Sequence, residues 1–470
     1  MPVMPVVLWT DALVFLLVAL GIGFGVYASR HEHLRAPWRR VARSRVGVAT
    51  LVVLSFYVIV GLLDTVHFRA RLTDQAPGAQ TQYAPEILSL LDLWLAPLRE
   101  RQEKTYSAPF ATHLFVKEAV TRSDGTVVRD YPRLAYGGSH LEDPDRKGMD
   151  ILLTALIGLV PGLVVWTLLS AGLIALHARR RGQSFAEARA AIAGGRTAVP
   201  WRVVLVTLAL MLAIAFAIGA LALKYHVLGT DKVGEDVFYQ ALKSVRTGLV
   251  IGTLTTLVML PAAILLGIMA GYFRGWVDDV IQYLYTTLNS IPGVLLIAAA
   301  ILLLQVYMSN NAEQFESLVE RADLRLLFLC LILGVTSWTG LCRLLRGDAL
   351  KLRESDYVQA AVALGVGHFS IIGRHILPNV LHIVMITLVL DFSGLVLAEA
   401  VLSYVNIGVD PTMNSWGNMI NSARLELARD PVVWWSLAAA FLFMFTLVLS
   451  ANLLADVVRD AFDPRLRGVR

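Results

Sequence analysis

Long apolar stretches alternate with short polar stretches along almost the whole chain of 470 residues. A helix needs about 20 residues to cross the ~30 Å apolar layer of a bilayer. Each stretch is expected to be helical, because lipid offers no hydrogen-bond partner to a free backbone N–H or C=O. About nine stretches are long enough to span, near residues 9–28, 46–63, 150–176, 201–223, 246–271, 280–304, 325–345, 380–404 and 433–457. The pattern predicts an all-α, polytopic membrane protein.

The composition supports this prediction. Hydrophobic residues make up 56% of the chain and charged residues only 16%, whereas roughly a quarter of the residues in a soluble protein are charged. The net charge of +5 does not indicate a nucleic-acid partner, because the basic residues lie in short loops beside apolar stretches. Cys330 and Cys342, the only cysteines, lie in or beside one apolar stretch, which excludes a disulfide framework and a CxxC metal site.

The arginine-rich loops predict the orientation. Residues 30–45 carry six arginines and one acid, and residues 178–202 also carry six arginines and one acid. Loops of this kind stay in the cytoplasm. Two predicted spans separate them, so residues 65–149 are expected outside. The N-terminus is then outside and the C-terminus is cytoplasmic.

The outer segment contains an apolar stretch from Ile87 to Leu98 that is too short to span. One interpretation is an amphipathic helix that lies on the membrane surface or on a partner. The other is an ordinary buried helix of a small extracytoplasmic subdomain. The sequence leaves both open.

A polar segment, DYVQAAVALGVGHFSIIGRHILPN, begins at Asp356 and interrupts the apolar C-terminal half. Ser355 and Asp356 suit a helix N-terminus. Gly365 and Gly367 are expected to stop this helix after Leu364. Four residues at helical spacing form one thin face, namely Tyr357, Ala360, Ala361 and Leu364.

A second short helix is predicted from His368 to Leu377. Pro378 is expected to end it, because proline cannot donate the hydrogen bond that a continuing helix needs. The segment should therefore form a helix, a glycine turn and a helix at the cytoplasmic face.

This segment resembles the coupling loop of ABC-importer permeases, in which a glutamate and two alanines are followed at fixed spacing by a glycine and an Ile-Leu-Pro ending. The match is closest to the dipeptide, oligopeptide and nickel group. Gln359 stands where the glutamate is usual, so the loop is expected to dock on an ATPase but a salt bridge from this position is not implied. The resemblance assigns ATPase coupling to Asp356, Tyr357, Gln359, Ala360, Ala361, Gly365, Arg374, His375 and Pro378.

Further segments follow in the order typical of the same group. They are HVLGTDKVGEDVF at 226–238, GYFRGWVDDV, LNSIPG, LDFSGLVLAEAVLSYVNIGV, NSWGNMI and VRDAFDPRLRG. The first has Glu235 where arginine is common. It is assigned as an extracytoplasmic signature with Gly229, Thr230, Asp231, Gly234 and Asp236. Together these segments cover about residues 200–470 and imply the type I ABC importer transmembrane fold.

The core of that fold has six spans, so about three N-terminal spans and an extracytoplasmic insertion are additions. We divide the chain into two transmembrane helices (1–64), an extracytoplasmic segment (65–149), a third span with a cytoplasmic linker (150–200) and the permease core (201–470), which includes the coupling loop (354–378). The additions carry no transport signature. We expect them to be accessory to a core that assembles without them.

The resemblance implies one permease subunit of an importer that carries peptides across a bacterial inner membrane. Its expected partners are a second homologous permease, one or two ABC ATPase subunits, an extracytoplasmic substrate-binding protein and the lipid membrane, without nucleic acid. ATP and Mg belong to the ATPase subunits. No cofactor, metal or catalysis is expected in this chain, which lacks a GxxxxGK[ST] phosphate loop.

Other functions stay open. Nickel, modified peptides or antibiotics are alternative substrates within the same family. A channel that works without ATP would leave the coupling loop unexplained. A membrane enzyme would need a catalytic constellation in residues 65–149, where none is visible.

Two acidic residues, Asp391 and Glu399, fall within the span after the coupling loop. A charge at mid-bilayer costs ~3 kcal/mol or more unless it faces protein or water, so both should point inward. They are candidates for the translocation pathway or the interface between permeases, or for buried hydrogen-bond partners that fix packing. Pro292 is expected to kink its span and is a candidate flexing point.

Overall fold

The computed structural model describes residues 3–72, 82–121, 127–311, 313 and 317–462. Within these residues, nine helical segments are long and apolar enough to cross a membrane. They contain α1 (Trp9–Arg30), α3 (Arg45–Thr65), α6 (Lys147–Arg181), α8 (Trp201–Ala222), α9 (Val237–Phe273), α11 (Gly293–Asn310), α12 (Leu318–Arg353), α15 (Leu377–Tyr404) and α17 (Trp435–Phe462). The predicted all-α, polytopic architecture is confirmed.

Shorter elements connect these helices. The short helices are α2 (Glu32–Val41), α4 (Leu90–Trp94), α5 (Ala96–Arg99), α7 (Phe185–Ala193), α10 (Trp276–Ser290), α13 (Asp356–Ala363), α14 (His368–Ile371) and α16 (Trp416–Glu426). A 3-10 turn at Pro144–Arg146 precedes α6, and a π-helical turn at Ile372–Ile376 joins α14 to α15. The strands are β1 (Val3–Val6), β2 (His67–Ala70), β3 (Leu88–Ser89), β4 (Glu118–Thr121) and β5 (Val127–Asp130).

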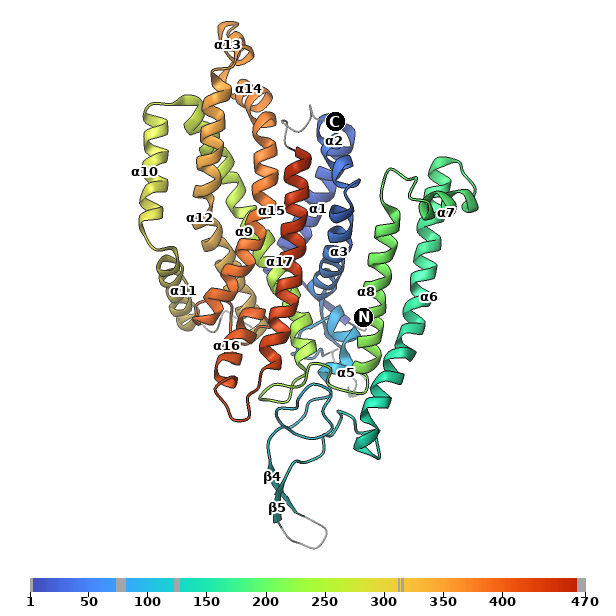
Figure 1. The fold of residues 1–470 in the computed structure, drawn as a ribbon. Helices are drawn as coiled ribbons and strands as arrows, with labels where there is room; N and C mark the ends of the chain where they lie inside the picture. The colour runs from blue at the N-terminus through green and yellow to red at the C-terminus, as the bar shows by residue number, and fades with distance from the viewer. Residues whose placement is uncertain (1–2, 73–81, 122–126, 312, 314–316, 463–470) are drawn as a thin grey trace.

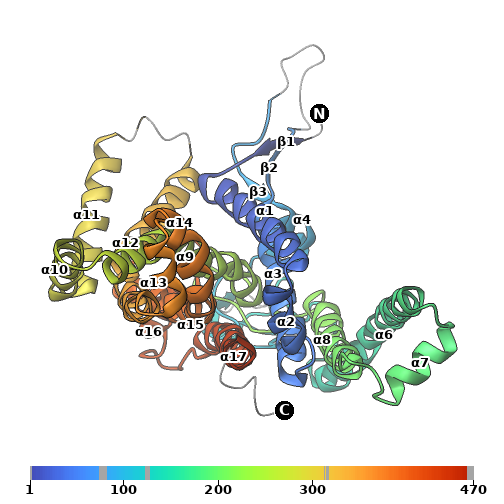
Figure 2. The same cartoon turned by 90° about the horizontal axis from the view of Figure 1, so that it is seen from above.

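Helices α9, α12, α15 and α17 lie at the centre of the molecule (Figures 1 and 2). Small residues allow α9 and α12 to approach closely, as is usual between helices in lipid. A Cβ atom added to Gly267 would lie 2.8 Å from the carbonyl oxygen of Cys342, and one added to Gly334 would lie 2.6 Å from Val258. Helices α1 and α3 flank this centre, α10 and α11 lie on one side, and α6 to α8 lie on the other.

The first strand ties the start of the chain to the outer segment. β1 pairs antiparallel with β2, with Val3 opposite Ala70 and Val6 opposite His67, and β2 pairs antiparallel with β3. The hairpin of β4 and β5 projects from the same end of the molecule (Figure 1). The N-terminal strand and the outer segment therefore share one end.

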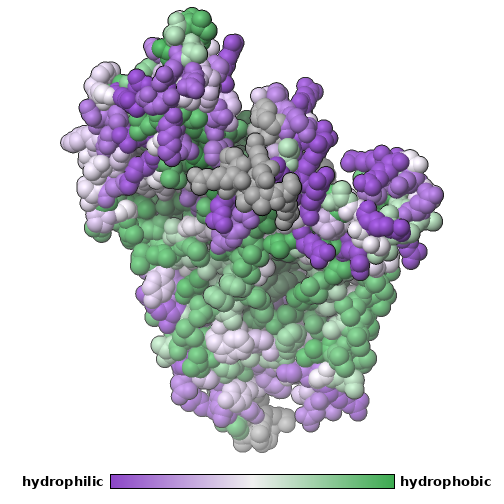
Figure 3. All heavy atoms as spheres, turned by 45° about the horizontal axis from the view of Figure 1, so that its top comes forward, coloured by the Kyte–Doolittle hydropathy of each residue, from purple (hydrophilic) through white to green (hydrophobic). Residues whose placement is uncertain are grey.

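The opposite end carries α13, α2, α7 and the end of α17 (Figure 1). Figure 3 shows hydrophilic residues over this end and a hydrophobic band below it. The two arginine-rich loops thus lie at the same end as the coupling loop, as the sequence predicts. That this end faces the cytoplasm stays a prediction. Residues 463–468 of the last family-like segment lie outside the described residues.

The span predicted at residues 280–304 is wrong as a single helix. The structure has two helices there, α10 and α11, that meet at Pro292. Ile291, which precedes the proline, has extended backbone with φ −90° and ψ 127°. A proline ring disfavours helical backbone in the residue before it, so the helix breaks instead of bending.

The apolar stretch from Ile87 to Leu98 forms two short helices, α4 and α5, rather than one amphipathic helix. Leu91, Leu95 and Leu98 are buried in the largest apolar cluster. Leu93 and Trp94 point outward and are 64% and 72% exposed. The three buried leucines fit the interpretation of a buried helix in an extracytoplasmic subdomain. The exposed Leu93 and Trp94 are free to contact a partner or a membrane surface.

Candidate functional site

Helix α13 projects at one tip of the molecule (Figure 1). It ends as predicted at a glycine turn, where Gly365 has a φ of +77° that favours glycine. The amide of Gly365 donates to Val362 O, and the amide of Val366 donates to Ala361 O, both at 3.0 Å. These two bonds satisfy carbonyl groups at the end of the helix and fix the direction in which the chain leaves it.

The predicted thin face of α13 divides between the protein and solvent. Ala361 is buried beside Val358. Ala360 and Gln359 are exposed, and Leu364 is 83% exposed. Ser355 occupies the N-cap position, but its hydroxyl donates to Leu352 O and does not cap the helix. The surface that α13 offers therefore contains only one of the two alanines.

Gln359 lies at the outer side of the loop. Its amide nitrogen is 3.4 Å from a carboxylate oxygen of Glu354. Glu354 also pairs with Arg274 at 2.7 Å. An acidic side chain thus lies next to the position at which the related loops carry their glutamate.

The second helix does not end at Pro378, so this prediction is wrong. Residues from His368 to Tyr404 form one helical segment that passes through the π-helical turn. The wider π-helical turn accommodates the proline within the helix, although proline lacks the N–H that a regular helix needs. His375 and Tyr357 pack against each other, and Asn379 donates to the carbonyl of His375 at 2.7 Å. Arg374 is exposed.

A buried apolar cluster joins the loop to the spanning helices. Val358 of α13, Ile371 of α14 and Ile376 of the π-helical turn are each fully buried. They belong to the same cluster as Tyr272 of α9 and Leu345 of α12. The loop is therefore packed directly against the helices at the centre.

The signature at residues 226–238 forms a tight turn before α9 at the opposite end. Gly229 and Gly234 have φ values of +71° and +80°. Asp231 accepts the amides of Val233 and Glu235, at 3.0 Å and 2.9 Å. The signature thus stabilises its own turn.

Two other signature residues attach this turn to its surroundings. The hydroxyl of Thr230 accepts the amide of Ser107 at 2.7 Å, and its carbonyl accepts the indole N–H of Trp435 at 2.9 Å. Asp236 caps α9 by accepting the amides of Phe238 and Tyr239. The signature residues therefore meet the outer segment rather than an open cavity.

Sequence reasoning missed a buried histidine in this turn. His226 Nδ1 lies 2.7 Å from Asp236 Oδ2, and Nε2 lies 3.4 Å from Glu103 Oε1. Burial alone would lower the pKa of His226, but the hydrogen bonds that its ring donates to Asp236 and Glu103, together with the negative charges of these carboxylates, raise it to about 9. Glu103 is itself held by three backbone amides, including that of Gly137 at 3.0 Å.

The pKa of Glu103 follows from the same contacts. Burial would raise it, but the hydrogen bonds from His226 and from the backbone amides lower it to about 2. Glu103 belongs to the outer segment, and no local pattern in the sequence connects it to His226. The pair shows that the outer segment closes over the signature turn.

Comparison with known proteins finds a family match in the C-terminal half of the chain. Residues 263–468 match the family described as binding-protein-dependent transport system inner membrane component. The chain is 31% identical over 244 residues to a glutathione transport system permease protein of Pectobacterium atrosepticum, which covers 52% of this chain and 73% of the relative. The chain belongs to this family of transport permeases.

Other relatives carry related names. An oligopeptide transport system permease protein of Haemophilus influenzae is 30% identical over 244 residues, which cover 52% of this chain and 71% of the relative. A dipeptide transport system permease protein of Bacillus subtilis is 28% identical over 242 residues, which cover 52% and 69%. The permease therefore has the type I importer transmembrane fold, and the family consists of transport components rather than enzymes.

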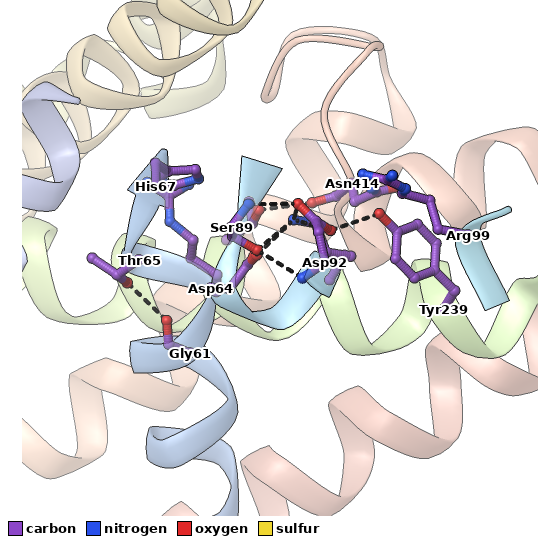
Figure 4. A network of polar contacts seen from close by, with 12 residues as sticks. Gly61, Asp64, Thr65, His67, Ser89, Asp92, Arg99, Tyr239 and Asn414 are labelled. Carbon is purple, nitrogen blue, oxygen red and sulfur yellow. Dashed lines mark hydrogen bonds and ion pairs between the residues drawn. The ribbon is translucent and has the colours of Figure 1, made fainter. Parts of the chain in front are cut away.

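A buried charge network joins the N-terminal part of the permease to α9 (Figure 4). Lys243 of α9 lies 2.6 Å from Asp64 of α3 and 2.9 Å from Asp92 of α4. Ser89 donates to Asp64 at 2.6 Å, and Tyr239 donates to Asp92 at 2.8 Å. All three charged side chains are at most 14% exposed.

A second cluster lies one turn further along α9. Arg246 is 2.6 Å from Asp11 of α1 and 3.5 Å from Asp323 of α12. His67 of β2 lies 2.8 Å from the other oxygen of Asp11. Buried ions need such partners, because an unpaired buried charge is strongly destabilising. Each of the two cations of α9 thus has at least one counter-ion from α1 to α4, and Asp323 of α12 is a second counter-ion of Arg246.

The acidic residues of α15 differ from each other. Glu399 is 2% exposed and accepts the Ser403 hydroxyl at 2.7 Å. Its carboxylate also packs against Gly417, whose added Cβ atom would lie 2.8 Å away. Asp391 is partly buried, and within the described residues it forms no hydrogen bond or ion pair. Their roles in the pathway or interface stay predictions.

Proposed function

We propose that this chain is one of two permease subunits of an ABC importer in a bacterial inner membrane, and that it forms half of the pathway for di- or oligopeptides. The observation that carries the proposal is the exposed α13–α14 loop, whose sequence resembles the coupling loop. The relatives named as dipeptide, oligopeptide and glutathione permeases support a peptide-like substrate.

In this mechanism a binding protein delivers the peptide from outside, and a second permease completes the pathway. ATP and Mg bind to separate ATPase subunits, whose closure pushes α13. The buried cluster around Val358 and Ile371 passes this displacement to α9 and α12. Because these helices line up across the membrane, their movement opens the pathway on the outer side, and hydrolysis resets it.

The docking step is tested at the exposed tip of the loop. Phe369 is 83% exposed, so Phe369→Glu removes apolar contact area without opening a cavity in the permease. We expect the amount of ATPase subunit that co-purifies with the variant to be about tenfold lower than with the wild type, or lower still. The matched control is Phe185→Glu in α7, an exposed phenylalanine at the same end of the molecule. Equal ATPase retention in both variants would contradict the docking assignment.

The proposed orientation puts α13 in the cytoplasm and the β4–β5 hairpin outside. A cysteine placed at the exposed Ser139 should react with an impermeant thiol reagent in intact cells. One placed at the exposed Gly194 should react only after the cells are opened. The native Cys330 and Cys342 are buried and give a low background. The reverse pattern would overturn the orientation.

A further inference from the structure

A cavity of about 590 Å³ lies between the ends of α3 and α8, at the end of the molecule that carries α13. Arg43 and Arg45 line it on the side of α3, and Arg202 lines it on the side of α8. The size is in the range of small-molecule sites, which is typically 300–1,000 Å³. This cavity is not part of the coupling loop or of the signature turn.

The three arginines have no protein partner among the residues that the structure describes. Within the part of the chain that the structure describes, none of their side chains forms a hydrogen bond or an ion pair. Nearby Arg39, in contrast, pairs with Glu32 at 2.9 Å. Guanidinium groups offer several N–H donors in a fixed plane, which suits an anion with several acceptor oxygens, such as a phosphate.

The walls below the arginines are apolar. Trp201 begins α8, and Val203 and Val206 follow on the same side of the cavity. Both α3 and α8 are membrane-spanning helices that begin beside these arginines. The cationic part of the cavity therefore lies at headgroup level, where tryptophan is also enriched, and the valines lie toward the hydrocarbon.

The opposite halves of the two helices are in contact. Tyr57 of α3 and Leu221 of α8 belong to one buried cluster. The cavity lies at the other ends of these helices, where Arg45 begins α3 and Trp201 begins α8. The cavity is thus open at the headgroup level and closed further down by protein.

We propose that the cavity binds an anionic phospholipid, with its phosphate on Arg43, Arg45 and Arg202 and part of an acyl chain along Val203 and Val206. A free phosphate ion matches the arginines but leaves the apolar wall without a partner. The bound lipid fills the space between α3 and α8 and thereby stabilises the attachment of the α6–α8 group.

Trp201 is a built-in reporter for this site. The full-length chain, purified in detergent, is titrated with phosphatidylglycerol brominated on its acyl chains, and quenching is compared with that of the Trp201→Phe variant because the chain has 10 tryptophans. We expect saturable quenching of Trp201 at concentrations at least about tenfold lower than with brominated phosphatidylcholine. Equal quenching by both lipids would overturn the proposal.

Two further measurements exclude other occupants. Inorganic phosphate should not relieve the quenching at concentrations comparable to those of the lipid, and relief would assign the site to a free anion. Addition of the ATPase subunit should not protect Trp201 from the brominated lipid. Loss of the lipid quenching on addition of the ATPase subunit would assign the cavity to a protein partner.

The arginines are tested with charge-matched variants. The triple variant Arg43→Gln, Arg45→Gln, Arg202→Gln should weaken the lipid quenching by about fivefold for each arginine removed. The control removes the same charge at the end of α6, with Arg179→Gln, Arg180→Gln and Arg181→Gln, none of which lines the cavity. Equal weakening in both would show general surface attraction and overturn the site. The single variant Arg202→Gln and a triple Arg→Lys variant keep the test valid if the first triple variant does not fold.

Discussion

The helices before residue 223 attach to the rest of the molecule in two different ways. The group from α1 to α5 contributes Asp11, Asp64 and Asp92 to buried ion pairs with α9. The group from α6 to α8 packs mainly on itself and on α3. Its ion pair with the following loop, Lys224 with Asp150 at 3.0 Å, is partly exposed.

This difference shows that a segment without family-like sequence can still form buried ion pairs with the family-like helices. Both groups precede the family-like segments, which begin at His226. The sequence leads us to expect only residues 1–200 to be accessory, and it places α8 in the permease core. The structure shows that both cations of α9 pair with carboxylates of the first group, and that Arg246 also pairs with Asp323 of α12. Removing α1 to α4 would take these ion pairs away from α9, so we expect the folding of α9 to depend more on the first group than on the second. That residues 1–200 are accessory and that α8 belongs to the core stay predictions.

The largest expected effect comes from breaking the buried cluster of Arg246, Asp11 and Asp323. Arg246→Met leaves Asp11 and Asp323 buried without their cation, and loss of one partner of a buried pair costs about 3–5 kcal/mol. We expect a large loss of folded protein and a lower thermal unfolding temperature in detergent. The control is Arg39→Met, because Arg39 and Glu32 form an exposed pair, and such pairs contribute about 0–1 kcal/mol. A similar loss of folded protein in both variants would show that the ion pair between Asp11 and Arg246 does not stabilise the contact of α1 with α9.

The next largest expected effect is a pH dependence of stability, which tests the contact between the outer segment and His226. The pKa of His226 is raised from 6.5 to about 9, so its contribution is complete below pH 6.5 and is lost as the pH rises through 9. A shift of this size corresponds to about 3 kcal/mol. The free energy of unfolding of the wild type should therefore exceed that of His226→Gln most at pH 6, and the difference should shrink toward pH 9.

A second variant links this window to Glu103. Glu103→Gln removes one of the two carboxylates that hold the proton on His226. The upper edge of the stability window should then move to lower pH, as followed by unfolding in denaturant at several pH values. A wild-type advantage over His226→Gln that is constant from pH 6 to pH 9 would contradict the assigned ion cluster.

The sequence predicts those features that local pattern determines. Eight of the predicted spans correspond to single helical segments, because length and hydropathy alone decide whether a helix can cross lipid. The glycine turn after α13 is also correct, since the left-handed backbone at Gly365 is a local requirement.

The wrong predictions concern features that depend on the local backbone geometry around a proline or on contacts between distant parts of the chain. Pro378 lies within a helix because a π-helical turn accommodates it, and Pro292 ends a helix where a kink was expected. The partners of Lys243 could not be predicted, because Asp64 and Asp92 are 179 and 151 residues away along the chain. A lysine and an arginine three residues apart on a spanning helix were the available signal, since such charges require partners from other helices.

The smallest expected effect concerns the α6–α8 group. Gly158 of α6 faces α8, where an added Cβ atom would lie 2.7 Å from the carbonyl oxygen of Phe216. Gly158→Leu should separate the two helices at a cost of about 1–3 kcal/mol, as is usual for overpacking. We expect faster amide hydrogen exchange in α6 and α8 but unchanged retention of the ATPase subunit. The matched control is Gly172→Leu on the same helix, where no atom lies within 4 Å. Loss of ATPase binding in Gly158→Leu alone would show that ATPase binding depends on the contact of α6 with α8.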